Sequence, residues 1–370
     1  MRIRISGMLA CVLMCSNLGS QAVSLSNFNV ESILSIQEDS FMPNADTEVS
    51  AGARFAPAAS VLLEAAFTLE ISDMADFLHP LPEYREPGNF YFDGASLQFP
   101  RRSETGASWG VFTGFFDDPS SDSLLKRELK TSVSQPEFRA MPAGSVFDPD
   151  PVIAGNGLVF WGVPGDGSLA LAGYGYWNSL MGSDTALTWD VRASRTDVFF
   201  TYNMYGGFLA EMATGVPYLR AGFTGLFSSE QGNSLFIEGI LKDYAPGSKK
   251  RIDRNIHILF EPRIQLRPAD IALSFFYSPL EEENTNYIGG NLLIGFGGLK
   301  KNRMRGGMSV LASIDPNNPG TISPFSFSLT PFYAVAKGDF AIESAAVIHP
   351  LSFDEWRSAV QLQLRVKAVY

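Results

Sequence analysis

The stretch QLQLRVKAVY, residues 361–370, decides the fold because its side chains alternate strictly between two characters. Counted from the preceding residue, the first set is apolar or aromatic: Val360, Leu362, Leu364, Val366, Ala368 and Tyr370. The second set is polar or charged: Gln361, Gln363, Arg365 and Lys367. Alternation with a period of two puts the two sets on opposite faces of a β-strand, whereas a helix would scatter both around its circumference. The stretch therefore predicts a strand with one apolar face and one polar face.

Other parts of the chain repeat this alternation. The clearest are VLLEAAFTLEI, TALTWDVRA, IHILFEPRIQL and PFSFSLTPFYAV, residues 61–71, 185–193, 256–266 and 324–335. Weaker examples are residues 28–36, 48–56, 89–99, 107–116, 157–163, 167–177, 197–205, 216–227, 234–241, 270–277, 286–296, 304–314 and 339–348. With the terminal stretch, these segments make 18 candidate strands. Two clear segments contain an interior proline, Pro262 and Pro331, which removes a ladder hydrogen bond and predicts a β-bulge or a misplaced boundary there.

The first 22 residues have the pattern of an export signal. Arg2 and Arg4 form its basic start, residues 8–14 its apolar core, and the small residues Ser20 and Ala22 suit cleavage before Val23. Both cysteines lie in this segment, so the exported chain, residues 23–370, has no thiol and no disulfide. Loss of the two arginines moves the formal net charge from −11 to −13. This charge disfavours nucleic acid as a partner, because phosphates require a basic surface.

The apolar faces indicate contact with lipid. After residue 22 there is no run of the ~18 apolar residues of a membrane helix, so only strands could cross a membrane. The clear strands have the ~9–11 residues that spanning requires. Aromatic residues lie near their ends, where an interfacial girdle would lie: Trp189, Phe260, Tyr333, Trp356 and Tyr370. Because hydrocarbon offers backbone groups no partner, the sheet must close. The sequence predicts an all-β fold, a closed antiparallel transmembrane β-barrel of about 16 strands, within a range of 14–18.

The connections between the segments differ in length. Short ones such as PGDG, residues 164–167, and KGDF, residues 337–340, carry the Asp-Gly or Gly-Asp pairs of tight hairpins. Long polar ones are residues 73–88, 117–156, 243–255 and 279–285. Residues 117–156 are too long for a simple hairpin loop, and two readings stay open: a segment folded into the barrel lumen that narrows it, and a solvated external loop.

An export signal, alternating strands throughout residues 23–370 and a terminal strand that ends in an aromatic residue resemble a bacterial outer-membrane β-barrel of the porin type. The resemblance covers the whole exported chain but is architectural, and no motif assigns a particular porin family. It implies a cell outer-membrane location, contact with outer-membrane lipid, and a terminal signal at Val366, Ala368 and Tyr370 that barrel-assembly machinery reads. Homo-oligomers are common in such proteins, although nothing in this sequence marks an interface.

Charged residues on the predicted inner faces are the candidate functional residues: Glu64, Glu70, Asp190, Arg192, Glu238, Glu261, Arg263, Glu343, Arg365 and Lys367. A basic residue facing lipid at the midplane would cost ~2–4 kcal/mol, whereas facing a wet lumen it creates the field that a solute feels. In the long loop, the candidate constriction residues are expected to face acidic wall residues: Lys126, Arg127, Lys130 and Arg139. A structural alternative is that Asp190 pairs with Arg192 and Glu261 with Arg263 along the wall.

Motifs for other chemistry lack their structural context. GASWG, residues 106–110, matches G-x-S-x-G around Ser108 but continues as a strand, and GDGSLA, residues 165–170, fits a hairpin turn rather than a nucleotide loop. His79, His257 and His349 have no metal-ligand spacing. We expect no enzymatic activity, no cofactor and no metal.

The favoured hypothesis is a passive outer-membrane channel for small hydrophilic solutes. Two alternatives stay open. One is a plugged barrel, with residues 23–46 as the plug, that binds or transports a hydrophobic ligand or acts as a surface adhesin. The other is a secreted soluble β-sandwich with a binding or enzymatic function.

Overall fold

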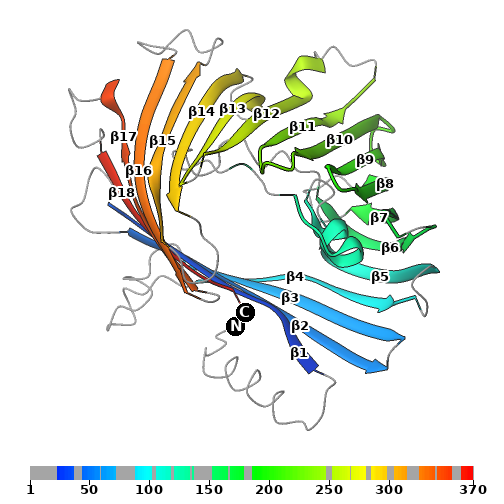
Figure 1. Cartoon of the computed structure of the whole chain (residues 1–370). Helices are drawn as coiled ribbons and strands as arrows, with labels where there is room; N and C mark the ends of the chain where they lie inside the picture. The colour runs from blue at the N-terminus through cyan, green and yellow to red at the C-terminus, as the bar shows by residue number, and fades with distance from the viewer. Residues whose placement is uncertain are drawn as a thin grey trace.

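The computed structural model describes residues 23–36, 44–58, 60–71, 88–101, 106–117, 121–133, 136, 152–165, 167–178, 186–246, 252–266, 268–280, 285–297, 304–314, 325–337, 340–351 and 360–369. These residues form one sheet of 18 strands (Figure 1). The strands are β1 (Val23–Ile36), β2 (Asn44–Ala58), β3 (Val61–Ile71), β4 (Asn89–Phe99), β5 (Gly106–Asp117), β6 (Ile153–Val163), β7 (Leu169–Asn178), β8 (Ala186–Thr196), β9 (Phe200–Glu211), β10 (Pro217–Ser228), β11 (Ser234–Tyr244), β12 (Ile256–Leu266), β13 (Ala269–Leu280), β14 (Thr285–Gly297), β15 (Met304–Ile314), β16 (Phe325–Lys337), β17 (Phe340–Ile348) and β18 (Val360–Val369). No helix in this part of the chain is long and apolar enough to span a membrane.

The strand pairings form a ring. Each strand pairs antiparallel with the strand that follows it in the sequence, and β1 pairs with β18 as well as with β2. The register of the last pair places Glu31 opposite Lys367 and Val30 opposite Ala368. The all-β antiparallel fold is therefore confirmed, and all 18 candidate segments are strands, two more than the expected 16.

The ring also corrects two of the alternatives. The sandwich reading is wrong, because the strands belong to one sheet rather than to two stacked sheets. The plug reading of residues 23–46 is wrong as well, because Val23–Ile36 is a wall strand that hydrogen-bonds to both of its neighbours.

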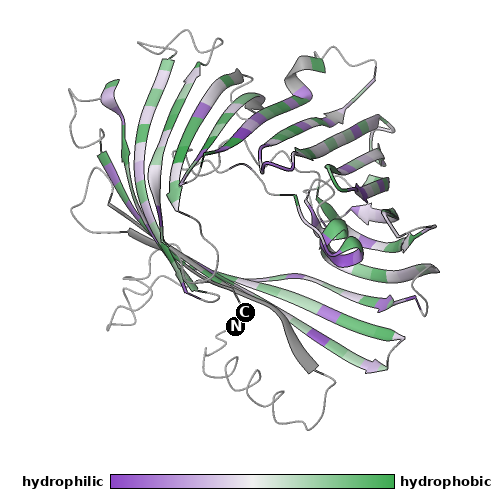
Figure 2. Cartoon of the chain, in the orientation of Figure 1, coloured by the Kyte–Doolittle hydropathy of each residue, from purple (hydrophilic) through white to green (hydrophobic). Residues whose placement is uncertain are grey.

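The two faces of the sheet differ as the alternation predicts. In β8, Asp190 and Arg192 on the inner face are each 2% exposed, whereas Trp189 and Val191 on the outer face are 48% and 65% exposed. In β18, exposed leucines alternate with half-buried glutamines. Figure 2 shows the resulting bands of hydrophobic and hydrophilic residues along the strands. An exposed apolar outer face is the reverse of what a water-soluble sheet presents.

The expected β-bulge or boundary at the two prolines is wrong. β12 pairs with β11 in unbroken register through Pro262, and β16 pairs with β15 through Pro331. Towards β13 and β17 the register is the same on both sides of each proline, but no Cα pair is assigned at the proline itself within these described strands. Since proline lacks the N–H, the ladder is interrupted on one side while the alignment of the strands is kept.

All connections longer than six residues lie at one end of the ring. At the end where β1 begins and β18 ends, connections range from two residues, 59–60, to six, 100–105. At the other end they range from residues 281–284 to residues 118–152. In the short connection of residues 164–168, Gly165 and Gly167 have φ of 68° and 83°, which suits the predicted tight turn.

Candidate functional site

Part of the longest connection, residues 121–133, lies inside the ring (Figure 1). It contains one helical turn of π type, η2 (Leu125–Leu129), which ends at Lys130 in a left-handed conformation with φ of 55°. Leu124 and Leu125 are fully buried, and Val133 is 3% exposed. Adjacent leucines point to different sides of a helical turn, so this segment can contact two surfaces at once.

The apolar side chains of residues 121–133 pack against two parts of the inner wall. Leu124 belongs to a cluster with side chains of β5, β6 and β7: Phe112, Ile153, Val159, Trp161, Val163, Ala170, Ala172, Tyr174 and Tyr176. Leu125 and Val133 belong to a second cluster with side chains of β11, β12, β13 and β15: Phe236, Leu259, Phe276 and Leu311. Leu129 packs against both clusters. The segment therefore bridges the inner faces of β5–β7 and of β11–β15.

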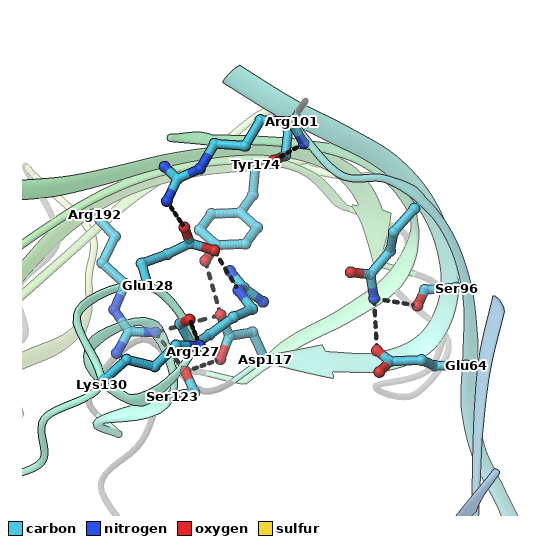
Figure 3. Close-up of polar contacts among 12 residues, drawn as sticks. Glu64, Ser96, Arg101, Asp117, Ser123, Arg127, Glu128, Lys130, Tyr174 and Arg192 are labelled. Atoms are coloured by element: carbon cyan, nitrogen blue, oxygen red, sulfur yellow. Dashed lines mark hydrogen bonds and ion pairs between the residues drawn. The ribbon is translucent and has the colours of Figure 1, made fainter. Parts of the chain in front are cut away.

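A polar network ties the start of this segment to the wall (Figure 3). Arg192 donates from Nη1 to Ser123 Oγ at 2.9 Å and to Asp117 Oδ2 at 3.3 Å, and from Nη2 to the carbonyl of Ser121. Tyr174 donates to Asp117 Oδ2 at 2.8 Å, and Ser123 donates to Asp117 Oδ1. The side chain of Arg192 is fully buried and that of Asp117 is 3% exposed. We call these five residues the clamp.

Asn203 of β9 extends the clamp. Its Oδ1 accepts from Arg192 Nε at 2.7 Å, and its Nδ2 donates to the carbonyl of Ser121 at 3.3 Å. Buried charge-assisted hydrogen bonds of this kind are stronger than neutral ones and fix geometry. The clamp therefore holds residues 121–123 in one position against β8 and β9.

A second contact holds the helical turn. Glu128 forms an ion pair with Arg101 at 3.3 Å and another with Arg127 at 3.5 Å. Arg101 lies just after the end of β4. The guanidinium of Arg127 lies 4.9 Å from the ring centroid of Trp161, within cation–π range. Lys126 pairs with Asp122 at 2.7 Å, and Lys130 donates to the carbonyl of Arg127 at 2.8 Å.

These contacts correct the expected arrangement of the constriction. Lys126 and Lys130 have their resolved partners within the segment rather than on an acidic wall, and Arg139 lies outside the described residues. The wall instead supplies cations, Arg101 and Arg192, while the segment supplies acceptors. The clamp residues Asp117, Ser121, Ser123 and Tyr174 were missed, because no local spacing signals contacts between positions so far apart in sequence.

The inner wall carries further ion pairs. Asp190 pairs with Arg220 of β10 and not with Arg192, so the expected pairing along β8 is wrong. Asp190 and Arg220 both lie opposite Gly207 of β9, across which their side chains meet. Residues i and i+2 of one strand are ~6.5–7 Å apart, whereas a glycine between two strands leaves room for a direct cross-strand contact.

Of the other wall pairs, one lies within a strand and the rest join different strands. Glu261 does pair with Arg263, at 2.6 Å. The remaining pairs join neighbouring or next-nearest strands: Asp270 with Arg305 at 2.7 Å, and Glu64 with Arg54 at 3.5 Å. His257 Nε2 of β12 lies 3.3 Å from Glu238 Oε1 of β11.

Gly207 gives a direct test of this packing. A Cβ at this position would lie 1.8 Å from Asp190 Oδ1, whereas a Cβ at the adjacent Gly206 would meet nothing within 4 Å. We expect Gly207→Ala to lower the free energy of unfolding by ~1–3 kcal/mol and Gly206→Ala to leave it unchanged or raise it. Urea unfolding in detergent micelles measures both, and equal stabilities would contradict the Asp190–Arg220 geometry.

The other predicted residues lie on β3, β17 and β18. Glu70 is exposed, and Glu343 lies opposite Arg365 in register. The side chain of Lys367 and all of Tyr370 lie outside the described part of the chain, while Val366 is half-buried. Ser108 is 2% exposed within β5, where its Oγ accepts from the backbone N–H of Arg101 at 2.9 Å.

Among known proteins, similarity to this chain is found only at the level of solved structures. No family model matches the chain, and no curated protein matches it. Solved structures with a similar fold include OmpF of Salmonella typhi in complex with daunomycin (9% identity, 94% of this chain and 97% of that chain, TM-score 0.48). A mutant of the Rh. blastica porin (11%, 94% and 100%, 0.47) and OprB of Pseudomonas putida at low pH (7%, 99% and 96%, 0.45) are further examples. Similarity at this level concerns the fold alone.

The all-β antiparallel ring has the porin-like fold that the sequence predicted, and of the two open readings of residues 117–156, the segment folded into the lumen holds for residues 121–133.

Proposed function

We propose that the protein is an outer-membrane channel through which small hydrophilic solutes diffuse passively, narrowed by residues 121–133. The observation that carries the proposal is the segment itself, clamped inside a ring whose inner face carries most of the charged side chains of the strands and whose outer face is apolar. Diffusion through such a lumen requires bore and charge rather than a catalytic residue or a cofactor.

The outer face supports a membrane location. Large apolar side chains are exposed around the ring, among them Val191 at 65%, Phe160 at 56% and Leu362 at 50%. In water this surface would drive association, whereas in a bilayer it meets hydrocarbon, and the ring leaves no unpaired strand edge. Residues 1–22 would be removed during export. In the outer membrane, the short connections and both ends of the barrel would then lie on the periplasmic side.

Charges on the inner wall would set the field in the lumen. These are the predicted residues Glu64, Glu70, Asp190, Arg192, Glu238, Glu261, Arg263, Glu343, Arg365 and Lys367.

The terminal strand carries a second proposed feature. We propose that Val366, Ala368 and Tyr370 form the signal for barrel-assembly machinery, since apolar residues at every second position end in an aromatic one.

Recording from refolded residues 23–370 in a planar bilayer tests the proposal, with heat-modifiable gel migration as the check of folding. Discrete conductance steps are expected, and a folded but silent barrel would overturn it. Such silence would favour a barrel plugged by residues 121–133 rather than by residues 23–46, which the apolar packing of residues 121–133 against both walls also fits.

Replacing residues 121–133 by a Gly-Ser linker of equal length should raise the single-channel conductance by about half or more, because the inner wall of β5–β7 and β11–β15 would become wet. The same replacement in the connection of residues 315–324 is the control. Unchanged conductance in the first variant would remove the segment from the mechanism.

A further inference from the structure

Polar and charged side chains on the inner wall fall into two groups by exposure. From β8 to β16 most of them are buried, at 9% exposure or less: Asp190, Arg192, Arg220, Glu238, His257, Glu261, Ser309, Ser328 and Thr330. Arg263 and Asp270 are half-buried, and Gln265 at the end of β12 is exposed. On β2, β3, β17 and β18 they are exposed or half-buried: Glu48, Ser50, Arg54, Glu64, Thr68, Glu70, Glu343, Gln361, Gln363 and Arg365. We call these the covered wall and the open wall. Water therefore reaches the open wall, whereas most of the covered wall is shielded from it.

Packing accounts for part of this division. Residues 121–133 lie on β5–β7 and β11–β15, and Phe332 of β16 packs on the inner face against Ala272 and Leu293. No residue of the segment belongs to a described cluster with β2, β3, β17 or β18. The wet part of the interior is therefore displaced from the segment towards the open wall.

The two walls also differ in charge. On the covered wall each buried guanidinium has a carboxylate: Arg192 pairs with Asp117, Arg220 with Asp190, and Arg305 with Asp270. On the open wall, Arg54 pairs with Glu64, and Arg365 lies opposite Glu343. These pairs nearly cancel and leave little net field.

Glu48 and Glu70 do not fit this pattern, because neither forms an ion pair with a cation among the described residues, although Tyr91 hydrogen-bonds to Glu70. The two glutamates lie directly opposite each other on β2 and β3, and both are exposed. The other cross-strand neighbour of Glu48 is Glu31 of β1, which itself lies opposite Lys367 of β18. Like charges directly opposite each other lower the stability of a sheet. Dissolved cations near Glu48 and Glu70 would offset this repulsion.

We propose that the path of permeating solutes runs along the open wall and that Glu48 and Glu70 make it select for cations. The inference rests on the proposed channel function and names the wall and the residues that determine its selectivity. Field lines from two carboxylates in a confined wet space raise the local concentration of cations and lower that of anions.

The path is tested by cysteine labelling, for which the exported chain is suited because residues 23–370 contain no cysteine. Ser50→Cys on the open wall is matched by Ser328→Cys on the covered wall, where Ser328 is 2% exposed. In liposomes, a water-soluble cationic methanethiosulfonate should label Ser50→Cys about tenfold faster or more, because an exposed thiol ionises and reacts while a buried one does not. Equal rates, or faster labelling of Ser328→Cys, would overturn the path, whether or not the barrel conducts.

Selectivity is tested by the reversal potential in a gradient of potassium chloride. Glu48→Gln with Glu70→Gln should lower the potassium-to-chloride permeability ratio by about twofold or more. Asp197→Asn with Glu230→Gln removes the same charge from exposed turns at residues 197–199 and 229–233 and is the control. An unchanged ratio in the first variant, or an equal change in the control, would overturn the selectivity while leaving the channel itself in place. Silence of the wild-type barrel, in contrast, would overturn the proposed function.

Discussion

Replacing Arg192 with methionine is expected to lower the free energy of unfolding of the barrel by about 3–5 kcal/mol. The substitution leaves Asp117, whose side chain is 3% exposed, as a buried charge without its cation. Tyr174 and Ser123 still donate to Asp117, but the carbonyl of Ser121 loses its guanidinium donor. Methionine fills a similar volume, so the effect isolates the charge and its hydrogen bonds rather than a cavity.

Urea unfolding in micelles measures this effect, and single-channel recording reports its consequence for function. Without the clamp, residues 121–123 lose their anchor on β8, so we expect a larger or noisier conductance. Arg195→Met is the matched control on the same strand, because Arg195 is 46% exposed and pairs with Asp197 at 3.3 Å. An exposed pair contributes about 0–1 kcal/mol. Equal losses in the two variants would show that the clamp does not hold the segment.

Asp117→Asn combined with Arg192→Met completes the test. Removing both charges takes away the uncompensated carboxylate, so the double variant should be more stable than Arg192→Met alone. A double variant that loses the sum of the two single effects would contradict a direct interaction between these residues.

The wall of the barrel was predictable because it depends on a local signal. In residues 187–192, each inward position is polar and each outward position is apolar, and β8 buries Asp190 and Arg192 while it exposes Trp189. A period of two fixes both the strand and its faces without knowledge of any neighbour. The same signal led to all 18 strands, whereas the choice of 16 came from an expectation about even strand numbers and expected errors rather than from a residue.

The interior was less predictable because it depends on contacts between distant residues. Asp117 and Arg192 are 75 positions apart in the sequence. Arg220 lies on β10, two strands from Asp190 on β8, and the two side chains meet across Gly207 of the strand between them. Sequence spacing favours partners at i and i+2, which explains why Glu261 with Arg263 was found and Asp190 with Arg220 was not. Which of the residues 117–156 enter the ring depends on where Leu124 and Leu125 find apolar surface, and that surface exists only after the wall has formed.

Substituting arginine for Val191 separates a barrel in lipid from one in water. Val191 lies in the middle of β8 and is 65% exposed on the outer face, whereas Val198, in the turn between β8 and β9, is 82% exposed. In a bilayer, Val191→Arg should lower the free energy of unfolding by ~2–4 kcal/mol and Val198→Arg by ~0–1 kcal/mol, because the cost of a charge falls towards the interface. In water, both substitutions would lie on exposed surface and their effects on the free energy of unfolding should differ little.

Folding into lipid vesicles followed by urea unfolding measures the difference between the two variants. Two equally tolerated variants would mean that hydrocarbon does not surround this face, and the channel proposal would then lose the membrane on which it depends.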